Sequence, residues 1–409
     1  MRKVFIYDAT PCGRRKLDSK RLSNYFTKNE YIIVKNPKKA DIIILNTCAY
    51  SDERTIFSIK KVEDFKKYDA DLIVVGCLPG IEEERLKEIF SGNYISTKNL
   101  EKFDDFFPEN KYKFSELGDE ITFWRNINEK SLTNILPSSV YKFINKLLSS
   151  KLINGFLSTE FKILSMTNKE VAHIRISYGC PANCSYCVIK KAVGPLKSKS
   201  VEVCIGEFKD SIEKGYKKFF ITADDIGSYG IDIGTTFIHL LDEIIKIDKN
   251  FTIGIESLRP LWIVKFSKDL ERLVKTGKIE FIGCSVQSGS AKILKKMNRY
   301  SDTKKIKESI LKIKKSYPEI VLITEIIVGF PTETSFDFEK TLDFFKEVKF
   351  DLGYIYRYSD RAGSLSEKID GKISADEIDG RMNTIYKLLR GMGYKIRYER
   401  SKTVLIFSN

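Results

Sequence analysis

The chain has 409 residues, of which 42% are hydrophobic and 31% are charged, and its formal net charge is +15. This balance is typical of a soluble globular protein with two or three domains. No run of about 18 apolar residues occurs, which excludes a membrane-spanning helix, and the N-terminal MRKVFIYDAT lacks the apolar core of a signal peptide. We therefore expect a cytoplasmic protein without a membrane partner. The basic charge favours a nucleic-acid partner only weakly, because a lysine-rich amino-acid composition common to the whole proteome would explain the charge as well.

Residues 1–100 alternate short apolar runs with amphipathic stretches, a pattern typical of a parallel sheet covered by helices. The runs that predict buried strands are 4–7, 31–34, 41–45 and 72–75, and those that predict helices are 18–28, 52–67 and 82–90. The expected N-terminal domain is therefore an α/β domain with a doubly wound parallel sheet.

Residues 101–170 break this alternation, and we expect a linker or insertion there. One or two amphipathic helices are expected within 132–164, interrupted at Pro137 and Gly155. Helical periodicity fits a segment that binds the substrate and equally one that packs against the body of the protein.

In residues 171–370 the strand–helix alternation resumes, and six β/α units predict a partial (β/α)6 TIM barrel with its chemistry at the C-terminal strand ends. The expected strands are 172–177, 218–222, 251–255, 281–286, 321–328 and 351–356. The expected helices are 200–214, 235–247, 290–298, 303–315 and 335–347. Residues 371–409 form a short C-terminal segment with a helix near 375–391 and a strand at 402–407.

Eight cysteines and only two histidines, His173 and His239, make thiolates the main candidates for metal ligands. Cys180, Cys184 and Cys187 have the spacing C-x3-C-x2-C directly after the first barrel strand. No fourth ligand lies near enough in the sequence to complete a tetrahedral zinc site. Three thiolates can instead hold three irons of a [4Fe-4S] cluster and leave the fourth iron open to chelate another molecule.

Cys12, Cys48 and Cys77 each follow an expected strand of the N-terminal sheet. Because the carboxyl ends of parallel strands share one edge of a sheet, these three sulfurs can converge. They fit a second cluster with an open iron, although three separate buried thiols fit the residues too. Cys204 and Cys284 lie away from both sets, and we expect them to pack as small apolar side chains.

The string GCPANCSYC (179–187), with an aromatic residue before its last cysteine, resembles the cluster motif of the radical S-adenosylmethionine superfamily. Together with LNTC (45–48) and GCLP (76–79), it resembles the methylthiotransferase family that acts on tRNA or ribosomal protein. Four further segments match motifs of that family in the expected order: ITADDIGSYG (221–230), SVQSGSAKILKKMNR (285–299), IIVGFPTETSFDF (326–338) and YSDRAGS (358–364). The resemblance covers nearly all of residues 1–370.

This resemblance implies two [4Fe-4S] clusters, S-adenosyl-L-methionine and a low-potential electron donor. The barrel cluster with S-adenosylmethionine is expected to generate a radical that activates an unactivated C–H carbon, and the N-terminal cluster is expected to deliver the methylthio group. Ligands to the clusters are then Cys12, Cys48, Cys77, Cys180, Cys184 and Cys187.

A cofactor with an amino acid, a ribose and an adenine needs polar groups at the strand ends. We expect Asp224 or Asp225 to accept from its ammonium or ribose, and Gln287 and Ser288 to bind the ribose. Gly329 would allow a close approach of the adenine, and Arg361 would pair with a carboxylate or phosphate. Loop stability or helix capping explains each of these residues as well, and Glu333 is expected to cap a helix rather than act as a catalytic acid.

The leading substrate is a modified adenosine at position 37 of tRNA, of the threonylcarbamoyl or isopentenyl type, and DIGT (232–235) resembles the threonylcarbamoyl branch. The alternative is an aspartate β-carbon of a protein or a natural-product precursor peptide. Residues after 392 are too few for the C-terminal TRAM domain that usually binds the substrate, which favours this alternative.

The chain also has Val193-Gly194 where the family usually has Arg-Gly, and Arg15 where it usually has asparagine. A non-catalytic electron carrier is a third possibility, which production of 5′-deoxyadenosine would exclude.

Overall fold

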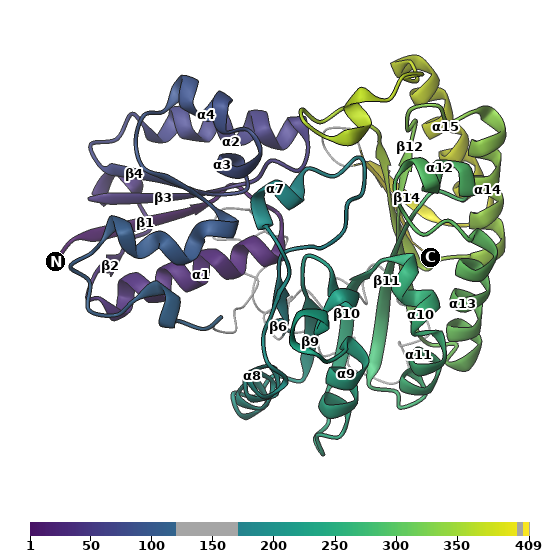
Figure 1. Ribbon diagram of the computed structural model, residues 1–409, viewed down its shortest axis with the longest axis horizontal. Helices are drawn as coiled ribbons and strands as arrows, with labels where there is room; N and C mark the ends of the chain where they lie inside the picture. The colour runs from purple at the N-terminus through teal and green to yellow at the C-terminus, as the bar shows by residue number, and fades with distance from the viewer. Residues whose placement is uncertain (120–170, 399–403, 409) are drawn as a thin grey trace, which may run out of the picture.

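The computed structural model describes residues 1–119, 171–398 and 404–408. The helices expected within 132–164 therefore lie outside the described residues. The described chain forms two α/β bodies that lie side by side, a smaller N-terminal domain and a larger open barrel (Figure 1). None of the described helices is both long enough and apolar enough to cross a bilayer.

The N-terminal domain is built on a parallel sheet with the strand order β2-β1-β3-β4-β5. Its strands are β1 (Lys3–Asp8), β2 (Ile32–Ile33), β3 (Ile42–Thr47), β4 (Asp71–Gly76) and β5 (Tyr94–Ser96), and its α-helices are α1 (Gly13–Lys28), α2 (Asp52–Phe65), α3 (Leu78–Ile81) and α4 (Glu83–Ile89). Successive residues of β3 enter two different cores, Ile42 and Ile44 with α1 and Ile43 and Leu45 with α2. The doubly wound sheet is thus confirmed, because strands covered on both faces are apolar throughout.

Two expectations for this domain were wrong in detail. The run 31–34 was expected to be a buried strand, but β2 has only two residues, and Ile32 and Ile33 are 43% and 39% exposed. An edge strand paired only with β1 has one side open to solvent. Helix α1 begins at Gly13 rather than at 18, since its first turn carries arginines that the apolar pattern does not reveal.

The start of the expected linker completes the core of the N-terminal domain. A 3-10 helix (Thr97–Phe106) and the turn after it bring Phe103, Phe107 and Phe114 against α1. The ring of Tyr25 lies 5.6 Å from that of Phe103, and the ring of Phe26 lies 5.3 Å from that of Phe107, both edge to face or tilted. Aromatic pairs at this spacing add to the burial energy. The N-terminal body therefore continues to Leu117, beyond residue 100.

The barrel contains the six expected parallel strands in chain order, followed by two antiparallel strands. The strands are β6 (Val171–Arg175), β9 (Lys218–Thr222), β10 (Thr252–Leu258), β11 (Ile279–Gln287), β12 (Val321–Val328), β13 (Leu352–Arg357), β14 (Lys395–Tyr398) and β15 (Val404–Ser408). The helices are α7 (Ile189–Val193), α8 (Val201–Glu213), α9 (Phe237–Ile245), α10 (Pro260–Lys265), α11 (Ser267–Val274), α12 (Ala291–Lys296), α13 (Thr303–Ser316), α14 (Ser335–Val348) and α15 (Ala375–Gly391). A short hairpin of β7 (Ser177–Tyr178) and β8 (Lys197–Ser198) follows β6.

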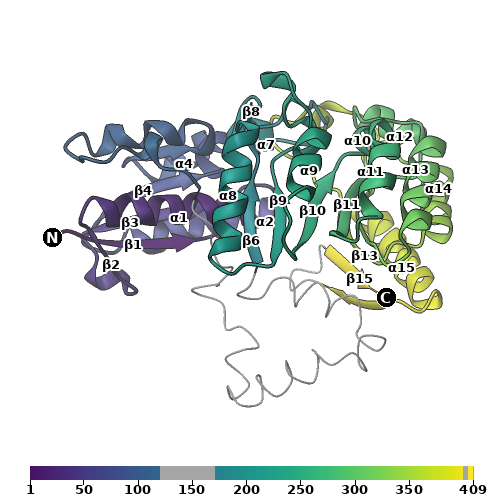
Figure 2. The same ribbon diagram turned by 90° about the horizontal axis from the view of Figure 1, so that it is seen from below.

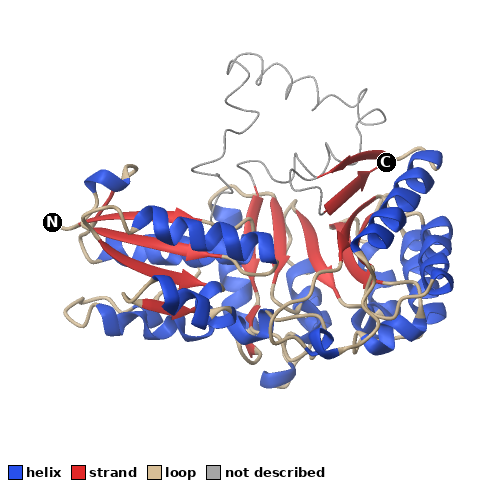
Figure 3. Cartoon of the chain, turned by 90° about the horizontal axis from the view of Figure 1, so that it is seen from above, coloured by secondary structure: helices blue, strands red, loops and turns tan. Residues whose placement is uncertain are grey.

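The sheet does not close on itself, since β6 forms one edge and β14 the other. The helices cover its outer side (Figure 2), and the strands curve around an interior that faces the N-terminal domain (Figure 3). The partial (β/α)6 barrel is confirmed. The sequence pattern did not reveal α10, α11 and β14, which are short.

Apolar side chains fill the barrel interior near the N-terminal ends of its strands. Val171, Phe281 and Val321 form a cluster there, separate from the core under the helices. Gly254 of β10 makes this packing possible, because a Cβ at that position would lie 1.8 Å from the ring of Phe281.

We predict that Gly254→Ala destabilises the protein by about 1–3 kcal/mol, the usual cost of overfilling a packed interior. Gly206→Ala, in the middle of α8 with nothing near its Cβ position, should instead stabilise by about 0.5–1 kcal/mol, because alanine loses less chain entropy in a helix. Thermal unfolding shows whether each variant is more or less stable than the wild type. A Gly254→Ala protein as stable as the wild type would contradict the packing described.

Arg361, in the loop after β13, joins the barrel to the N-terminal domain. Its side chain is 4% exposed and forms ion pairs with Asp52 and with Glu82 at 3.2 Å. It also donates to the carbonyl of Ala49 at 2.8 Å and to Oγ1 of Thr55 at 3.0 Å. The carboxylates that it meets are therefore side chains of the N-terminal domain.

We predict that Arg361→Ala destabilises the docking of the two domains by about 3–5 kcal/mol, because it leaves the buried Glu82 carboxylate with only the more distant Arg85, at 3.9 Å. Arg357→Ala on β13, which removes an exposed ion pair with Asp379, should cost less than about 1 kcal/mol. Denaturant unfolding and limited proteolysis between the domains compare the two variants. Equal losses would show that Arg361 does not hold the domains together.

Candidate functional site

The N-terminal trio, Cys12, Cys48 and Cys77, stands at one edge of the N-terminal sheet. The three cysteines follow β1, β3 and β4, which are neighbouring parallel strands. These strands end on the side that faces the barrel (Figure 1). Cys12 precedes the first turn of α1 and Cys77 that of α3, while the amide of Cys48 donates to Oγ of Ser58 at 3.1 Å. This sheet order is the one that the expected convergence requires, and the convergence itself stays a prediction.

The three thiols of the N-terminal trio influence one another electrostatically. Burial raises the pKa of Cys77, negative charge on Cys48 and Cys12 raises it further, and the guanidinium of Arg15 opposes the shift. Burial also raises the pKa of Cys48, and Cys12 adds to that shift. Such thiols stay protonated until a metal ion replaces the proton.

The barrel trio, Cys180, Cys184 and Cys187, lies in the loop after β7. This loop turns tightly at Gly179, where φ is +74° and a Cβ would lie 1.8 Å from the carbonyl oxygen of Pro195. The amide of Cys187 donates to the carbonyl of Cys184 at 3.1 Å, which folds the last two cysteines together. Burial and the nearby Asp225 raise the pKa of Cys180 to about 12.

All eight cysteines of the chain are free thiols. Within the described ranges, no three His, Cys, Asp or Glu side chains are placed to share a single ion. A [4Fe-4S] cluster takes each of its thiolates on a different iron, so it needs a wider arrangement than a single ion. Three soft thiols with no oxygen or nitrogen ligand among them fit iron–sulfur chemistry better than a hard cation. Cys204 and Cys284 are 0% and 3% exposed in the core under the helices, as expected.

Arginines accompany both trios. Arg14 interacts with Cys12 and Arg15 with Cys77. In the barrel, Arg299 contacts Sγ of Cys184 at 3.7 Å and the hydroxyl of Tyr186 at 3.3 Å, and Arg259 lies near Cys180. Cations beside thiols favour the deprotonated form that binds metal. Both trios thus have the charge that a thiolate cluster requires.

Several residues expected to bind the cofactor have partners within the protein. Asp225 accepts from Arg259 at 2.6 Å and from the indole Nε1 of Trp262 at 3.1 Å. Ser288 is 0% exposed, and its Oγ accepts from the amide of Ser290 at 3.1 Å. Both side chains stabilise the rim of the barrel, and their contacts with the cofactor remain predictions, as do those of Arg361.

Gln287 fits a ligand best among the expected residues. It ends β11 with φ at +73° and is 6% exposed. The described residues offer its buried Oε1 no hydrogen-bond partner. A buried acceptor without a donor is costly, and a ribose hydroxyl would satisfy it.

Gly329 and Glu333 have structural roles that were not expected. A Cβ on Gly329 would lie 2.3 Å from the side chain of Ile378, so glycine lets α15 pack closely. Glu333 is 1% exposed, accepts from the amide of Gly329 at 2.8 Å and pairs with Arg381 at 2.6 Å. The expectation that Glu333 caps a helix was wrong, because Thr334 and Asp337 form the capping box of α14.

Sequence reasoning missed several polar groups in the barrel interior. Glu256 accepts from Arg14 at 3.1 Å and from the hydroxyl of Thr222. Burial and the charge of Glu256 raise the pKa of Glu325, while Arg14 and Arg299 lower it. A single acid inside an apolar strand, as in TIGIESL and VLITEIIV, was the available signal, since unpaired acids are rarely buried for packing alone.

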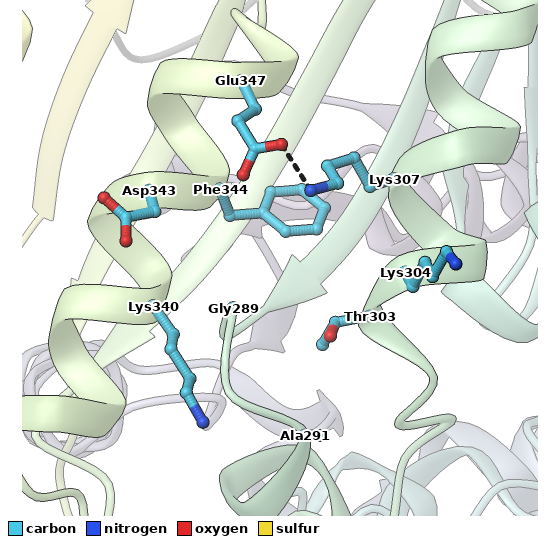
Figure 4. A pocket seen from close by; sticks show the side chains of 9 residues that line it. All are labelled: Gly289, Ala291, Thr303, Lys304, Lys307, Lys340, Asp343, Phe344 and Glu347. Carbon is cyan, nitrogen blue, oxygen red and sulfur yellow. Dashed lines mark hydrogen bonds and ion pairs between the residues drawn. The ribbon is translucent and has the colours of Figure 1, made fainter.

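A groove on the outer side of the barrel is not part of this site (Figure 4). It lies between α13 and α14 and contains the ion pair of Lys307 with Glu347. None of its lining residues is a cysteine, and both helices are on the outer side of the sheet.

Comparison with known proteins identifies two sequence families. The Radical SAM superfamily matches residues 174–345, and the family described as Uncharacterized protein family UPF0004 matches residues 5–95. A tRNA-2-methylthio-N(6)-dimethylallyladenosine synthase of Clostridium botulinum (strain Hall) is 31% identical over 408 residues, which cover 96% of this chain and 82% of that protein. A probable threonylcarbamoyladenosine tRNA methylthiotransferase of Pyrococcus horikoshii is 28% identical over 374 residues, covering 90% and 79%.

Solved structures share the fold at low sequence identity. The radical S-adenosylmethionine methyltransferase TsrM of Kitasatospora setae has a TM-score of 0.58 and 12% identity, covering 87% of this chain and 73% of that one. The cobalamin-dependent S-adenosylmethionine radical enzyme OxsB has a TM-score of 0.56 and 14% identity, covering 95% and 56%. These structures support the radical S-adenosylmethionine fold. With the sequence relatives, they lead to one conclusion: the chain belongs to the radical S-adenosylmethionine methylthiotransferase family, enzymes that use a [4Fe-4S] cluster and S-adenosylmethionine.

Proposed function

We propose that the protein attaches a methylthio group to an N6-modified adenosine of tRNA, at position 37 beside the anticodon. The relatives named above act, by their names, on dimethylallyladenosine and threonylcarbamoyladenosine of tRNA. The net charge of +15 suits a polyanionic substrate. A low-potential electron donor is part of the proposal.

The observation that carries this proposal is that both trios lie at the boundary between the two domains, where Cys180 packs against the core cluster of the N-terminal domain that contains Cys77. The N-terminal trio ends strands that point at the barrel, and the barrel trio follows the first barrel strand. Arg14, two residues after Cys12, pairs with Glu256 inside the barrel. A second [4Fe-4S] cluster on the N-terminal trio would therefore face the barrel interior, which supports a reaction that uses both sites.

When bound, the clusters and S-adenosylmethionine supply radical activation of a C–H bond and a sulfur donor. The protein's own residues set the charge and the hydrogen-bonding groups around these sites. Arg259 and Arg299 favour thiolates in the barrel trio, and Gln287 offers an acceptor to a hydroxyl. The apolar cluster of Val171, Phe281 and Val321 fills the interior near the N-terminal strand ends, and Glu256 and Glu325 lie further along their strands.

The two tRNA substrates differ in the group on N6, and the sequence relatives include enzymes named for each. The run DIGT (232–235) favours the threonylcarbamoyl form. A protein or peptide acceptor finds no support among these relatives, and the same assay tests it.

We predict that the anaerobic, cluster-reconstituted protein with dithionite and S-adenosylmethionine converts an anticodon stem-loop carrying threonylcarbamoyladenosine to its methylthio form. A stem-loop carrying isopentenyladenosine and a peptide with the ribosomal aspartate serve as competitors, and mass spectrometry of the digested products identifies the acceptor. Tracing the same nucleosides in tRNA from a deletion strain checks the result in the cell. Modification of the peptide alone would overturn the tRNA assignment.

Cysteine variants separate the two trios. Cys48→Ala should form 5′-deoxyadenosine without methylthio product, and Cys184→Ala should form neither, because each removes a ligand of one cluster only. Cys204→Ala, which alters a buried thiol outside both trios, should retain both products. Methylthiolation by Cys48→Ala would exclude the N-terminal trio as a sulfur site.

A further inference from the structure

Asp224 contacts both the loop of the barrel trio and the first turn of the helix that follows Cys12. Its Oδ2 accepts from the amide of Gly179 at 3.0 Å, the residue before Cys180. Its Oδ1 lies 3.3 Å from Nε of Arg14 and 3.7 Å from a guanidinium nitrogen of Arg15. The side chain is 5% exposed. One buried carboxylate just after β9 thus connects the loop of the barrel trio with helix α1, which follows Cys12.

The two arginines leave Asp224 little freedom to do anything else. Arg15 is 2% exposed and also pairs with Asp18 at 3.0 Å. A buried carboxylate is stable only while cations and hydrogen-bond donors surround it. Asp224 has both kinds of partner, a backbone amide from one domain and two guanidinium groups from the other. Binding of a cofactor ammonium would require it to give up part of this arrangement.

The first turn of α1 is held against the barrel by further contacts around Asp224. Arg14 donates to Glu256 of β10 at 3.1 Å, and its carbonyl accepts from Arg175 of β6 at 3.1 Å. Arg175 is 1% exposed and pairs with Asp18 at 2.6 Å and with Asp119 at 3.1 Å. Of the contacts named here, only the hydrogen bond from the amide of Gly179 to Asp224 involves the loop of the barrel trio.

We propose that Asp224, together with Arg14 and Arg15, is a positioning bridge that fixes the loops of the two cysteine trios relative to each other. The bridge rests on the proposed function, in which both trios bind clusters that act on one substrate. Its effect is on the geometry between the sites and not on either site alone. Misplacement of reacting groups by about 1 Å can reduce a rate by about a hundredfold, so a loose bridge should uncouple radical formation from product formation.

The first test measures the loop directly in the apo-protein. In Asp224→Ala the amide of Gly179 loses its acceptor, and hydrogen exchange of the peptide covering 177–181 should become about tenfold faster, a local loss of protection. Asp224→Asn keeps a carbonyl acceptor and should show a smaller change. Asp337→Asn is the matched control, because Asp337 is equally buried and paired, with Lys292 and Ser290, but lies away from both trios. It should leave the exchange of 177–181 unchanged.

The second test measures coupling in the reconstituted enzyme. Without substrate, Asp224→Ala should form 5′-deoxyadenosine within about twofold of the wild type, and with substrate its yield of methylthio product per 5′-deoxyadenosine should fall about tenfold. Asp337→Asn should keep the wild-type yield even if it is less stable. Asp224→Asn and Arg14→Gln should be non-additive in this yield, since they alter the same contact.

The two tests distinguish failure of the bridge from failure of the proposed function. An unchanged yield in Asp224→Ala overturns the bridge, and so does unchanged exchange of 177–181. Loss of 5′-deoxyadenosine in both Asp224 variants, with the cluster intact by its absorbance, would make Asp224 a cofactor-binding residue of the barrel instead. If the wild type forms 5′-deoxyadenosine but no methylthio product, the proposed function fails, while the exchange experiment still judges the bridge.

Discussion

The placement of the two cysteine trios depends on the ion pairs that cross the boundary between the N-terminal domain and the barrel. Arg175 reaches from β6 to Asp18 on α1, Arg14 reaches from α1 to Glu256 on β10, and Arg361 reaches from the barrel to Glu82. Buried ion pairs contribute little net stability, because desolvation offsets most of the attraction. They do penalise every other arrangement of the two domains, since any shift leaves a buried charge unpaired. Specific geometry is what a reaction between two sites requires.

The electrostatics of the trios follow from the same boundary. Burial raises the pKa of Cys77 and Cys180. Arg15 opposes this shift at Cys77 and Arg259 opposes it at Cys180, so both guanidinium groups favour the thiolate. A metal ion that binds these thiols has to displace their protons, and the guanidinium charges beside them favour that exchange.

The barrel interior is apolar near the N-terminal ends of its strands and polar closer to their C-terminal ends. Phe281 and Val321 occupy the N-terminal ends of their strands, whereas Glu256 and Glu325 stand closer to the C-terminal ends, below the trios. The arrangement follows from the alternation of side chains along each strand and from the shared register of parallel strands. Polar groups near the C-terminal ends can contact a substrate, and the apolar cluster packs the opposite end of the interior.

The sequence by itself determined most of the longer strands and helices of both domains, and it predicted the barrel trio as cluster ligands. The apolar runs, the helix periodicity and the spacing of Cys180, Cys184 and Cys187 are all local, so a linear pattern contains them. Tertiary structure decided the rest. Phe103 and Phe114 join the N-terminal core although they follow its last strand. Arg361 binds Ala49, 312 residues away in the sequence, Asp225 binds Arg259, and Glu333 binds Arg381. Asp224, for which cofactor binding stays a prediction, contacts the amide of Gly179 and the guanidinium groups of Arg14 and Arg15. A charged side chain pairs with an opposite charge that lies close to it in the folded protein. Which charge that is depends on how the two domains dock, and a local sequence pattern does not contain this information.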